Sequence, residues 1–394
     1  MYLGCSSTKR FSSDTNSELN SSNTIRVLLD NNSKELTISV TDEIFISDDK
    51  KSLAKVSSGN KLKFIKNSEK LNLTISDMEF VSNKFFLTAS DETGIIKIDG
   101  KKYRGRIVIS TIDSEIKVVN QIGLEDYVKG VMTKEMPIGK VTENYDALKA
   151  FSICVRTYAF NKINENKDFF DIYPDTRDQV YGGVEGETVY TNKIVDETKG
   201  QNLFYDNQPA TIFYHSTCGG QTENVANVFN KKNISYLSGV KDGVEPYCKI
   251  SPRYEWTEKY SGEVFINRLF NAKLINSENY TVSNIFIKSH YKSGRVNELE
   301  ITLIDFERIK KIILLFGNQI RSIIRSGDGK SILKSTLFDI NMNDEKNIII
   351  TGKGNGHGVG LCQWGAIGQS KKGINFNEIL NHYFPGTRIK SIYD

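Results

Sequence analysis

The chain has 394 residues and a formal net charge of only +4, spread along the sequence without a basic block. That balance argues against nucleic acid as the main partner. A hydrophobic content of 38% beside 25% charged residues is typical of a folded globular protein. No apolar run reaches the ~18 residues that a membrane-spanning helix needs.

The first residues carry a possible export signal. Leu3-Gly4-Cys5 has the form of the end of a bacterial lipoprotein signal, although no charged and apolar stretch precedes it. Residues 1–24 are otherwise rich in Ser, Thr and Asn, a composition typical of a flexible linker. One interpretation is a tether from a lipidated Cys5, or from a missing N-terminal anchor, to an exported domain. The other is a disordered tail with an unimportant cysteine.

Residues 25–118 are predicted to form a β-rich N-terminal part. Short alternating or apolar runs such as 25–29 and 36–40 are separated by turns of Asp, Asn, Ser and Lys. A helical segment then begins at Asp126. It is expected to end near Pro137, because the residue before a proline is pushed out of the helical region.

A helix over residues 146–163 is the clearest predicted element. It is apolar on almost every side, which indicates a buried helix. Its exceptions, Lys149, Ser152 and Arg156, are spaced i, i+3 and i+7 and therefore form one stripe. Because buried cations are rare unless paired, the stripe either forms a structural salt bridge or faces a cleft that contains Glu135 and a substrate.

Strand-like runs alternate with two helical segments in the rest of the chain. Residues 298–303 and 347–351 are predicted strands, whereas 310–316 and 376–383 are predicted helices. No internal repeat is apparent. The sequence predicts an α+β fold with β-rich lobes around a central buried helix and a substrate cleft between the lobes.

Glu135-Met136-Pro137 places one carboxylate in a partly apolar turn before the buried helix. Apolar neighbours raise the pKa of a carboxyl group, and glycosidic-bond cleavage needs a general acid that is still protonated near neutral pH. A cation from Lys149 or Arg156 within reach would oppose that shift. Four nearby carboxylates could act as a second catalytic group and so revive a hydrolytic mechanism: Glu125, Asp126, Glu143 and Asp146.

The segment 354–366 is rich in glycine, which lets the backbone approach a ligand closely. His357, Gln363 and Trp364 are its side chains that could contact a sugar. The alternative is a tight strand connection whose glycines serve sterics only.

The cysteines offer a candidate metal site. His215, Cys218 and Cys248 supply three ligands of the kind that zinc prefers, and a tetrahedral site needs a fourth. His357, Cys362 or a water molecule could supply it. In an exported protein the rival is a Cys218–Cys248 disulfide, and a free, inert pair is the third reading.

Taken in their order along the chain, these motifs resemble the SpoIID/LytB family. The resemblance extends from about Thr24 to the C-terminus and is specific, because many motifs match in sequence. The matching segments are 120–137, 147–159, 178–183, 215–223, 236–240, 293–296, 320–321, 335–338, 354–366 and 381–387.

The resemblance implies a peptidoglycan lytic transglycosylase over residues 119–392. Such an enzyme cleaves the MurNAc–GlcNAc bond of glycan strands, preferably those stripped of stem peptides, to leave 1,6-anhydro-MurNAc ends during sporulation. Glu135 aligns with the family's catalytic glutamate. Some members carry a bound zinc, so the resemblance favours a structural zinc over a disulfide. The family usually has Ser where this chain has Cys362.

Other branches of the family enhance cell-wall amidases and are not enzymes. A non-catalytic glycan-binding enhancer is therefore the alternative function, and a purely structural wall or spore-complex component is a third. The Glu-Met-Pro context of Glu135 favours the enzyme. The expected partners are glycan strands, a cell-wall amidase and membrane proteins of a sporulation complex, at the outer face of the cytoplasmic membrane.

Overall fold

The computed structural model describes residues 23–32, 34–165, 167, 169–229, 231–343 and 347–393. Cys5 and the tether predicted around it lie almost wholly outside these residues. The chain divides into two compact units, Met1–Val131 with Ala159–Gly186 and Met132–Tyr158 with Glu187–Asp394. Within the described ranges, no helix combines the length and the apolar character needed to cross a membrane.

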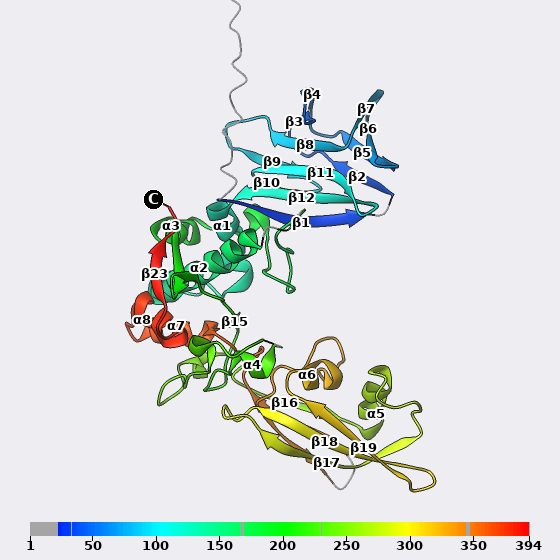
Figure 1. Cartoon of the computed structure of the whole chain (residues 1–394), viewed down its shortest axis with the longest axis vertical. Coiled ribbons are helices and arrows are strands. Elements are labelled where there is room, and N and C mark those ends of the chain that lie inside the picture. The colour runs from blue at the N-terminus through cyan, green and yellow to red at the C-terminus, as the bar shows by residue number, and fades with distance from the viewer. Residues whose placement is uncertain are drawn as a thin grey trace, which may run out of the picture. The chain divides into compact units, whose positions relative to one another are not determined.

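The first unit is built on two antiparallel sheets, drawn in blue and cyan in Figure 1. One has the strand order β1-β12-β11-β8-β3-β4 and the other β2-β5-β6-β7, beside a β9–β10 hairpin. The strands are β1 (Thr24–Asn32), β2 (Glu35–Ser39), β3 (Ile44–Ser47), β4 (Ser52–Val56), β5 (Lys61–Asn67), β6 (Lys70–Ile75), β7 (Met78–Ser82), β8 (Lys84–Ala89), β9 (Ile95–Ile98), β10 (Lys101–Arg104), β11 (Arg106–Ile112) and β12 (Glu115–Gly123).

The alternation of side chains explains how these sheets pack. In β5, Leu62 and Phe64 are fully buried, whereas Lys61 and Lys63 are exposed. Because successive side chains of a strand point to opposite faces, each strand presents one apolar face to the core. The rings of Phe64 and Phe85, on β5 and β8, have centroids 5.8 Å apart and join the two sheets. Strands are therefore present over the residues for which the sequence predicts them.

Two helices follow, α1 (Leu124–Glu135) and α2 (Val141–Asn164), and each contributes residues to both units. α1 ends at Glu135, close to Pro137 as expected. In α2 every residue from Ala147 to Thr157 is buried except the partly exposed Lys149. The prediction of a buried helix is therefore confirmed.

The second unit mixes short helices with small sheets. Its sheets have the orders β14-β13-β23, β16-β21-β20 and β17-β18-β19, with β15 parallel to β22. The elements are α3 (Val189–Glu197), β13 (Gln201–Tyr205), β14 (Gln208–Pro209), β15 (Tyr214–His215), α4 (Val225–Val228), β16 (Glu255–Tyr260), α5 (Gly262–Asn271), β17 (Tyr280–His290), β18 (Val296–Asp305), β19 (Lys310–Phe316), α6 (Gln319–Ile324), β20 (Phe338–Met342), β21 (Ile348–Lys353), β22 (Leu361–Cys362), α7 (Gln363–Lys371), α8 (Phe376–Tyr383) and β23 (Arg388–Ser391).

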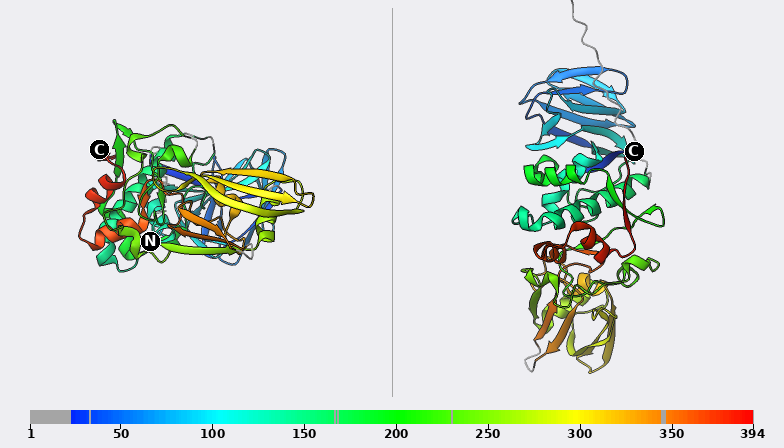
Figure 2. Two further views of the ribbon diagram at one scale, coloured as in Figure 1. Left: turned by 90° about the horizontal axis from the view of Figure 1, so that it is seen from below. Right: turned by 90° about the vertical axis from the view of Figure 1, so that its left-hand side faces the viewer.

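Residues 310–316 form strand β19, so the helix predicted there is wrong. Ile313 and Leu315 are buried, whereas Ile312 and Phe316 are about half exposed. This alternation of buried and exposed side chains has the two-residue period of a strand. A short apolar run does not distinguish helix from strand by itself. Pairing with β18, one of the yellow strands in Figure 1 and Figure 2, decides the outcome.

A single core of mainly aliphatic side chains joins the sheets β16-β21-β20 and β17-β18-β19 with α5 and α6. Trp256, Phe265 and Leu299 belong to it. The α+β class is thus confirmed, while a substrate cleft between lobes stays a prediction.

Candidate active site

Glu135 is the last residue of α1, and its side chain is partly exposed. The main-chain carbonyl of Glu135 accepts a hydrogen bond from Nε2 of Gln363, at 2.9 Å. The next residue, Met136, is 1% exposed and anchors the turn in the core. Two segments 228 positions apart, the predicted acid and the glycine-rich stretch, are therefore in direct contact.

Gln363 is the first residue of α7 and is only 5% exposed. Its amide nitrogen is used to hold the end of α1. A sugar contact through Gln363 stays a prediction. Sequence reasoning missed that Gln363 contacts the main chain of Glu135 and can position it. No spacing rule in the sequence links residue 363 to residue 135.

Lys149 is paired within the fold. Its Nζ lies 2.8 Å from Oε2 of Glu197 and 4.5 Å from the centroid of the Tyr145 ring. The hydroxyl of Tyr145 donates to the same Glu197 carboxylate. Burial lowers the pKa of Lys149, but the hydrogen bond to Glu197 and the neighbouring negative charges outweigh that effect, so the pKa is raised. Lys149 therefore remains charged, and contact with substrate stays a prediction.

Arg156 is fully buried. It donates to the main-chain carbonyls of Val195, at 3.3 Å, and Gln201, at 3.2 Å. Ser152, on the same stripe, lies with its Oγ 2.8 Å from Oγ1 of Thr198. The carbonyls at a helix C-terminus lack intrahelical partners and attract positive charge. The polar stripe of α2 thus contacts the C-terminal end of α3. Lys149 forms a salt bridge there, whereas Arg156 donates to main-chain carbonyls.

The glycine-rich stretch packs against the protein itself. A Cβ on Gly358 would lie 2.6 Å from Cζ of the buried Arg295, and one on Gly360 would lie 2.1 Å from the carbonyl oxygen of Phe213. Both glycines also have a positive φ. These positions exclude larger residues for steric reasons, which supports the alternative reading of the stretch as a tight connection.

His357 lies among aromatic rings. Its ring centroid is 5.2 Å from that of Phe229 and 5.5 Å from that of His215. Burial and then the charge of Arg321 lower the pKa of His357 to about 3, so the imidazole is neutral at physiological pH. Its Nδ1 accepts from the amide of Val359 at 3.1 Å. A contact between His357 and a sugar stays a prediction.

Trp364 is the remaining predicted sugar contact. Its side chain is partly exposed, and its backbone amide donates to the carbonyl of Ser216 at 3.0 Å. A contact between Trp364 and a sugar stays a prediction.

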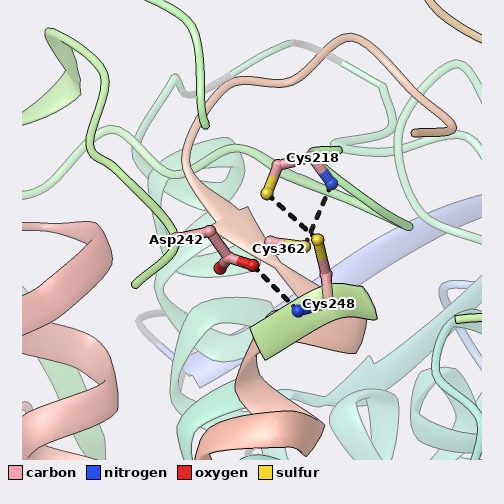
Figure 3. A group of neighbouring side chains, drawn as sticks. All are labelled: Cys218, Asp242, Cys248 and Cys362. Carbon is pink, nitrogen blue, oxygen red and sulfur yellow. Dashed lines mark hydrogen bonds between the residues drawn. The ribbon is translucent and has the colours of Figure 1, made fainter. Parts of the chain in front are cut away.

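Four buried side chains form a thiol cluster, which we define as Cys218, Asp242, Cys248 and Cys362. Their ligand atoms all lie within 4.8 Å of one another and point toward a common centre (Figure 3). The sulfurs of Cys218 and Cys248 are 3.5 Å apart, well beyond the ~2.05 Å of a disulfide. The cysteines are free thiols in this structure.

Backbone amides point at these sulfurs. Cys362 caps the N-terminus of α7, and its Sγ accepts from the amides of Gly365, at 3.3 Å, and Cys218, at 3.1 Å. Sγ of Cys218 accepts from the amide of Gly220 at 3.4 Å. N–H donors and a helix N-terminus stabilise a thiolate, which is the form that binds a metal.

The pKa values of the four groups in the thiol cluster are shifted in different directions. Hydrogen bonds from Cys218 and Cys362 lower the pKa of Cys248 to about 3. Burial raises the pKa of Cys218 and of Cys362. Burial, followed by the negative charge of Cys248, raises the pKa of Asp242 to about 7. The Asp242 carboxylate accepts from the Tyr383 hydroxyl at 2.6 Å and from the Cys248 amide at 2.8 Å.

Three sulfurs and one carboxylate oxygen form a donor set that fits zinc. His215 is not part of this group: its Nδ1 lies 3.1 Å from the Val359 carbonyl oxygen, and its ring is next to His357. The structure thus brings Cys218 and Cys248 together and adds Cys362, one of the fourth ligands considered. Sequence reasoning missed Asp242, because an aspartate six residues before a cysteine is not a recognised spacing of metal ligands.

Comparison with known proteins gives two matching families. The family described as Stage II sporulation protein matches residues 112–205, which include Glu135. A domain of unknown function matches residues 248–360.

Several curated proteins are similar over most of the chain. An uncharacterized protein of Brachyspira hyodysenteriae is 34% identical over 295 residues, which cover 74% of this chain and 73% of the relative. Stage II sporulation protein D of Bacillus subtilis is 30% identical over 69% of this chain and 75% of its own length. The amidase enhancer of Bacillus subtilis is 28% identical over 91% of this chain but 52% of its own length.

Proposed function

The chain belongs to the SpoIID family, and on that premise we propose that it is a lytic transglycosylase acting on peptidoglycan. Its substrate is the glycan strand, stripped of stem peptides, and its product is a 1,6-anhydro-MurNAc end formed during sporulation. The observation that carries the proposal is the partly exposed Glu135, fixed at the end of α1 by the hydrogen bond from Gln363 to its carbonyl.

One carboxyl group suffices for this reaction. Glu135 protonates the glycosidic oxygen, so that the bond from C1 of MurNAc to that oxygen breaks and GlcNAc leaves with a free hydroxyl. The resulting carboxylate takes the proton of the C6 hydroxyl of MurNAc, whose oxygen bonds to C1 and closes the anhydro ring. Because the attacking oxygen belongs to the same sugar, its effective concentration is high and no water has to be positioned.

We also propose that the thiol cluster holds a structural zinc ion. Cys218, Asp242, Cys248 and Cys362 would be its ligands, and the ion would neutralise their negative charge. It would take no part in bond cleavage. Cys362 directly precedes Gln363 in the chain, so an ion bound there supports the segment that contacts Glu135.

For the cellular location, we propose an exported protein at the outer face of the cytoplasmic membrane, held by a lipid on Cys5 or by an anchor further upstream. Membrane proteins of a sporulation complex and wall hydrolases are then within reach as partners.

A second candidate function is a glycan-binding enhancer of a cell-wall amidase. The similarity to the amidase enhancer, which extends over 91% of this chain, favours it. That function needs glycan binding but no chemistry at Glu135.

The test is mass spectrometry of peptide-free glycan strands after incubation with the wild type, Glu135→Gln and Glu263→Gln. Glu263 is an exposed carboxylate in the first turn of α5, is not one of the candidate second carboxylates, and serves as the control. We expect anhydro-muramyl ends from the wild type and the control, and loss of at least about 10²-fold in Glu135→Gln. Reducing ends would instead indicate hydrolysis with a second carboxylate, and binding without cleavage would favour the enhancer.

A further inference from the structure

A cavity of about 620 Å³ lies at the sheet β16-β21-β20, within the segment matched by the domain of unknown function. Glu135 and the thiol cluster are not among its lining residues. Its volume is within the range of about 300–1,000 Å³ that small-molecule sites occupy. The polar residues that line it are Glu255, Thr257, His290, Asp339, Thr351 and Lys353.

Residues of both faces of this sheet line the cavity, and two of them, Trp256 and Phe338, belong to the core. Trp256, Ile340 and Ile350 are buried on one face of the sheet, whereas Thr257 and Thr351 are exposed on the other. The outer face of these three strands is therefore polar, and it contributes Glu255, Thr257, Asp339, Thr351 and Lys353 to the lining of the cavity.

The side chains of this face form ordered rows across the strands. Thr351 on the central strand pairs directly with Thr257 on one side and Asp339 on the other. In the neighbouring row Glu255 is opposite Lys353, and Nζ of Lys353 lies 3.5 Å from Oε1 of Glu255. Side chains directly opposite one another on a sheet face are close enough to bind one ligand together.

The lining is suited to a neutral ligand with many hydroxyl groups. Carboxylates accept hydrogen bonds, an ammonium group donates them, and threonine hydroxyls do both. Two carboxylates, at Glu255 and Asp339, would repel a polyanion such as nucleic acid. Trp256, Leu337 and Phe338 add apolar surface to the lining, against which the C–H face of a sugar ring can pack.

We propose that this cavity is a second glycan-binding site, which holds sugar residues of the same strand away from the bond that is cleaved. This proposal rests on the proposed function only because it takes the peptidoglycan glycan strand as the ligand. Binding in the cavity requires no catalysis by Glu135. When one site of the protein holds a glycan strand, the second site meets the same strand at a high effective concentration. Long glycan strands that reach both sites therefore bind more tightly than short fragments.

The experiment measures binding of long peptide-free strands and of a disaccharide fragment to full-length Glu135→Gln, which prevents turnover. Thr351→Arg is introduced in that background to fill the cavity from the central strand without changing the core face. Thr281→Arg is the matched control, because Thr281 is an exposed threonine on β17 that does not line the cavity. Near-ultraviolet circular dichroism checks that each variant is folded, and Asp339→Ala is used if Thr351→Arg is not.

We expect Thr351→Arg to weaken the binding of long strands by about tenfold or more, with the control unchanged. Amide NMR signals of residues 255–257, 339 and 351–353 should shift when the disaccharide is added. Equal affinity of both variants for long strands, or no shift in those signals, would overturn the proposal. Cleavage is assayed separately in the Glu135-containing protein: loss of binding in Thr351→Arg without any wild-type cleavage would support this site and reject the transglycosylase.

Discussion

Gln363 shows how one buried side chain can connect two distant segments. Its Nε2 donates to the Glu135 carbonyl, at the end of a helix where carbonyls lack intrahelical partners. The bond fixes the main chain of Glu135 through its carbonyl and does not involve the carboxyl group. Gln363 is thus a positioning residue for the proposed acid and does not itself need to touch the reacting atoms.

Replacing Gln363 by alanine should therefore reduce turnover more than substrate binding. We expect kcat to fall about 10- to 100-fold with KM changed less than about threefold, because misplacing a catalytic group weakens the transition state selectively. Thermal unfolding should show a loss of about 1–2 kcal/mol. Gln369→Ala, which removes another buried glutamine of α7, is the control. An equal fall in kcat in both variants would indicate general destabilisation and no positioning by Gln363.

The polar stripe of α2 follows from helix geometry, because the spacing of Lys149, Ser152 and Arg156 along the chain places them on one side of the helix. The structure shows that these three residues contact the C-terminal end of α3 in different environments. Arg156 is fully buried on main-chain carbonyls, whereas the Lys149–Glu197 pair has side chains 19% and 30% exposed.

The two cations should consequently differ in their contribution to stability. Arg156→Ala removes a fully buried side chain together with its hydrogen bonds to two main-chain carbonyls and should lower the free energy of unfolding by about 3 kcal/mol or more. Lys149→Ala removes a solvent-screened pair and should cost no more than about 1 kcal/mol. Urea unfolding of both variants measures the difference. Similar losses for Arg156→Ala and Lys149→Ala would contradict the assignment of the buried role to Arg156.

Elements also show what the sequence could and could not predict. The buried helix α2 was predicted because its apolar residues cover every side over several turns. Strand β19 was not, because Ile312 to Phe316 is too short for a helical and an extended period to be told apart. Its pairing with β18 is a contact between different parts of the chain. The contact of Gln363 with Glu135 is of the same kind, and no local pattern indicates it.

At the scale of the second unit, the thiol cluster closes long loops of the chain. Cys218 and Cys362 are 144 positions apart, and Asp242 and Cys248 lie between them in sequence. Bringing such segments together costs chain entropy, which a bound ion offsets only in the folded state. The cluster is therefore expected to stabilise the fold around α7 and not to act in bond cleavage.

Removal of the metal should lower stability in a way that depends on Cys362. A chelator should reduce the free energy of unfolding of the zinc-loaded wild type by about 3 kcal/mol, the value for an ion present at about 100 times its Kd. Cys362→Ser should contain less zinc by elemental analysis and respond less to the chelator, because serine is a poor zinc ligand. Cys154→Ser is the matched control, since Cys154 is a buried free thiol of α2 outside the cluster.

Cobalt substitution gives a readout independent of activity, since thiolate ligands produce an intense charge-transfer absorption whose strength follows the number of sulfurs. The wild type and Cys154→Ser should show a three-thiolate spectrum, and Cys362→Ser a two-thiolate spectrum. Identical spectra for Cys362→Ser and the wild type would remove Cys362 from the ligand set. If cobalt produced no such absorption in any of the three proteins, the thiol cluster would not be a metal site, and stability would have to come from the packing of its four buried side chains alone.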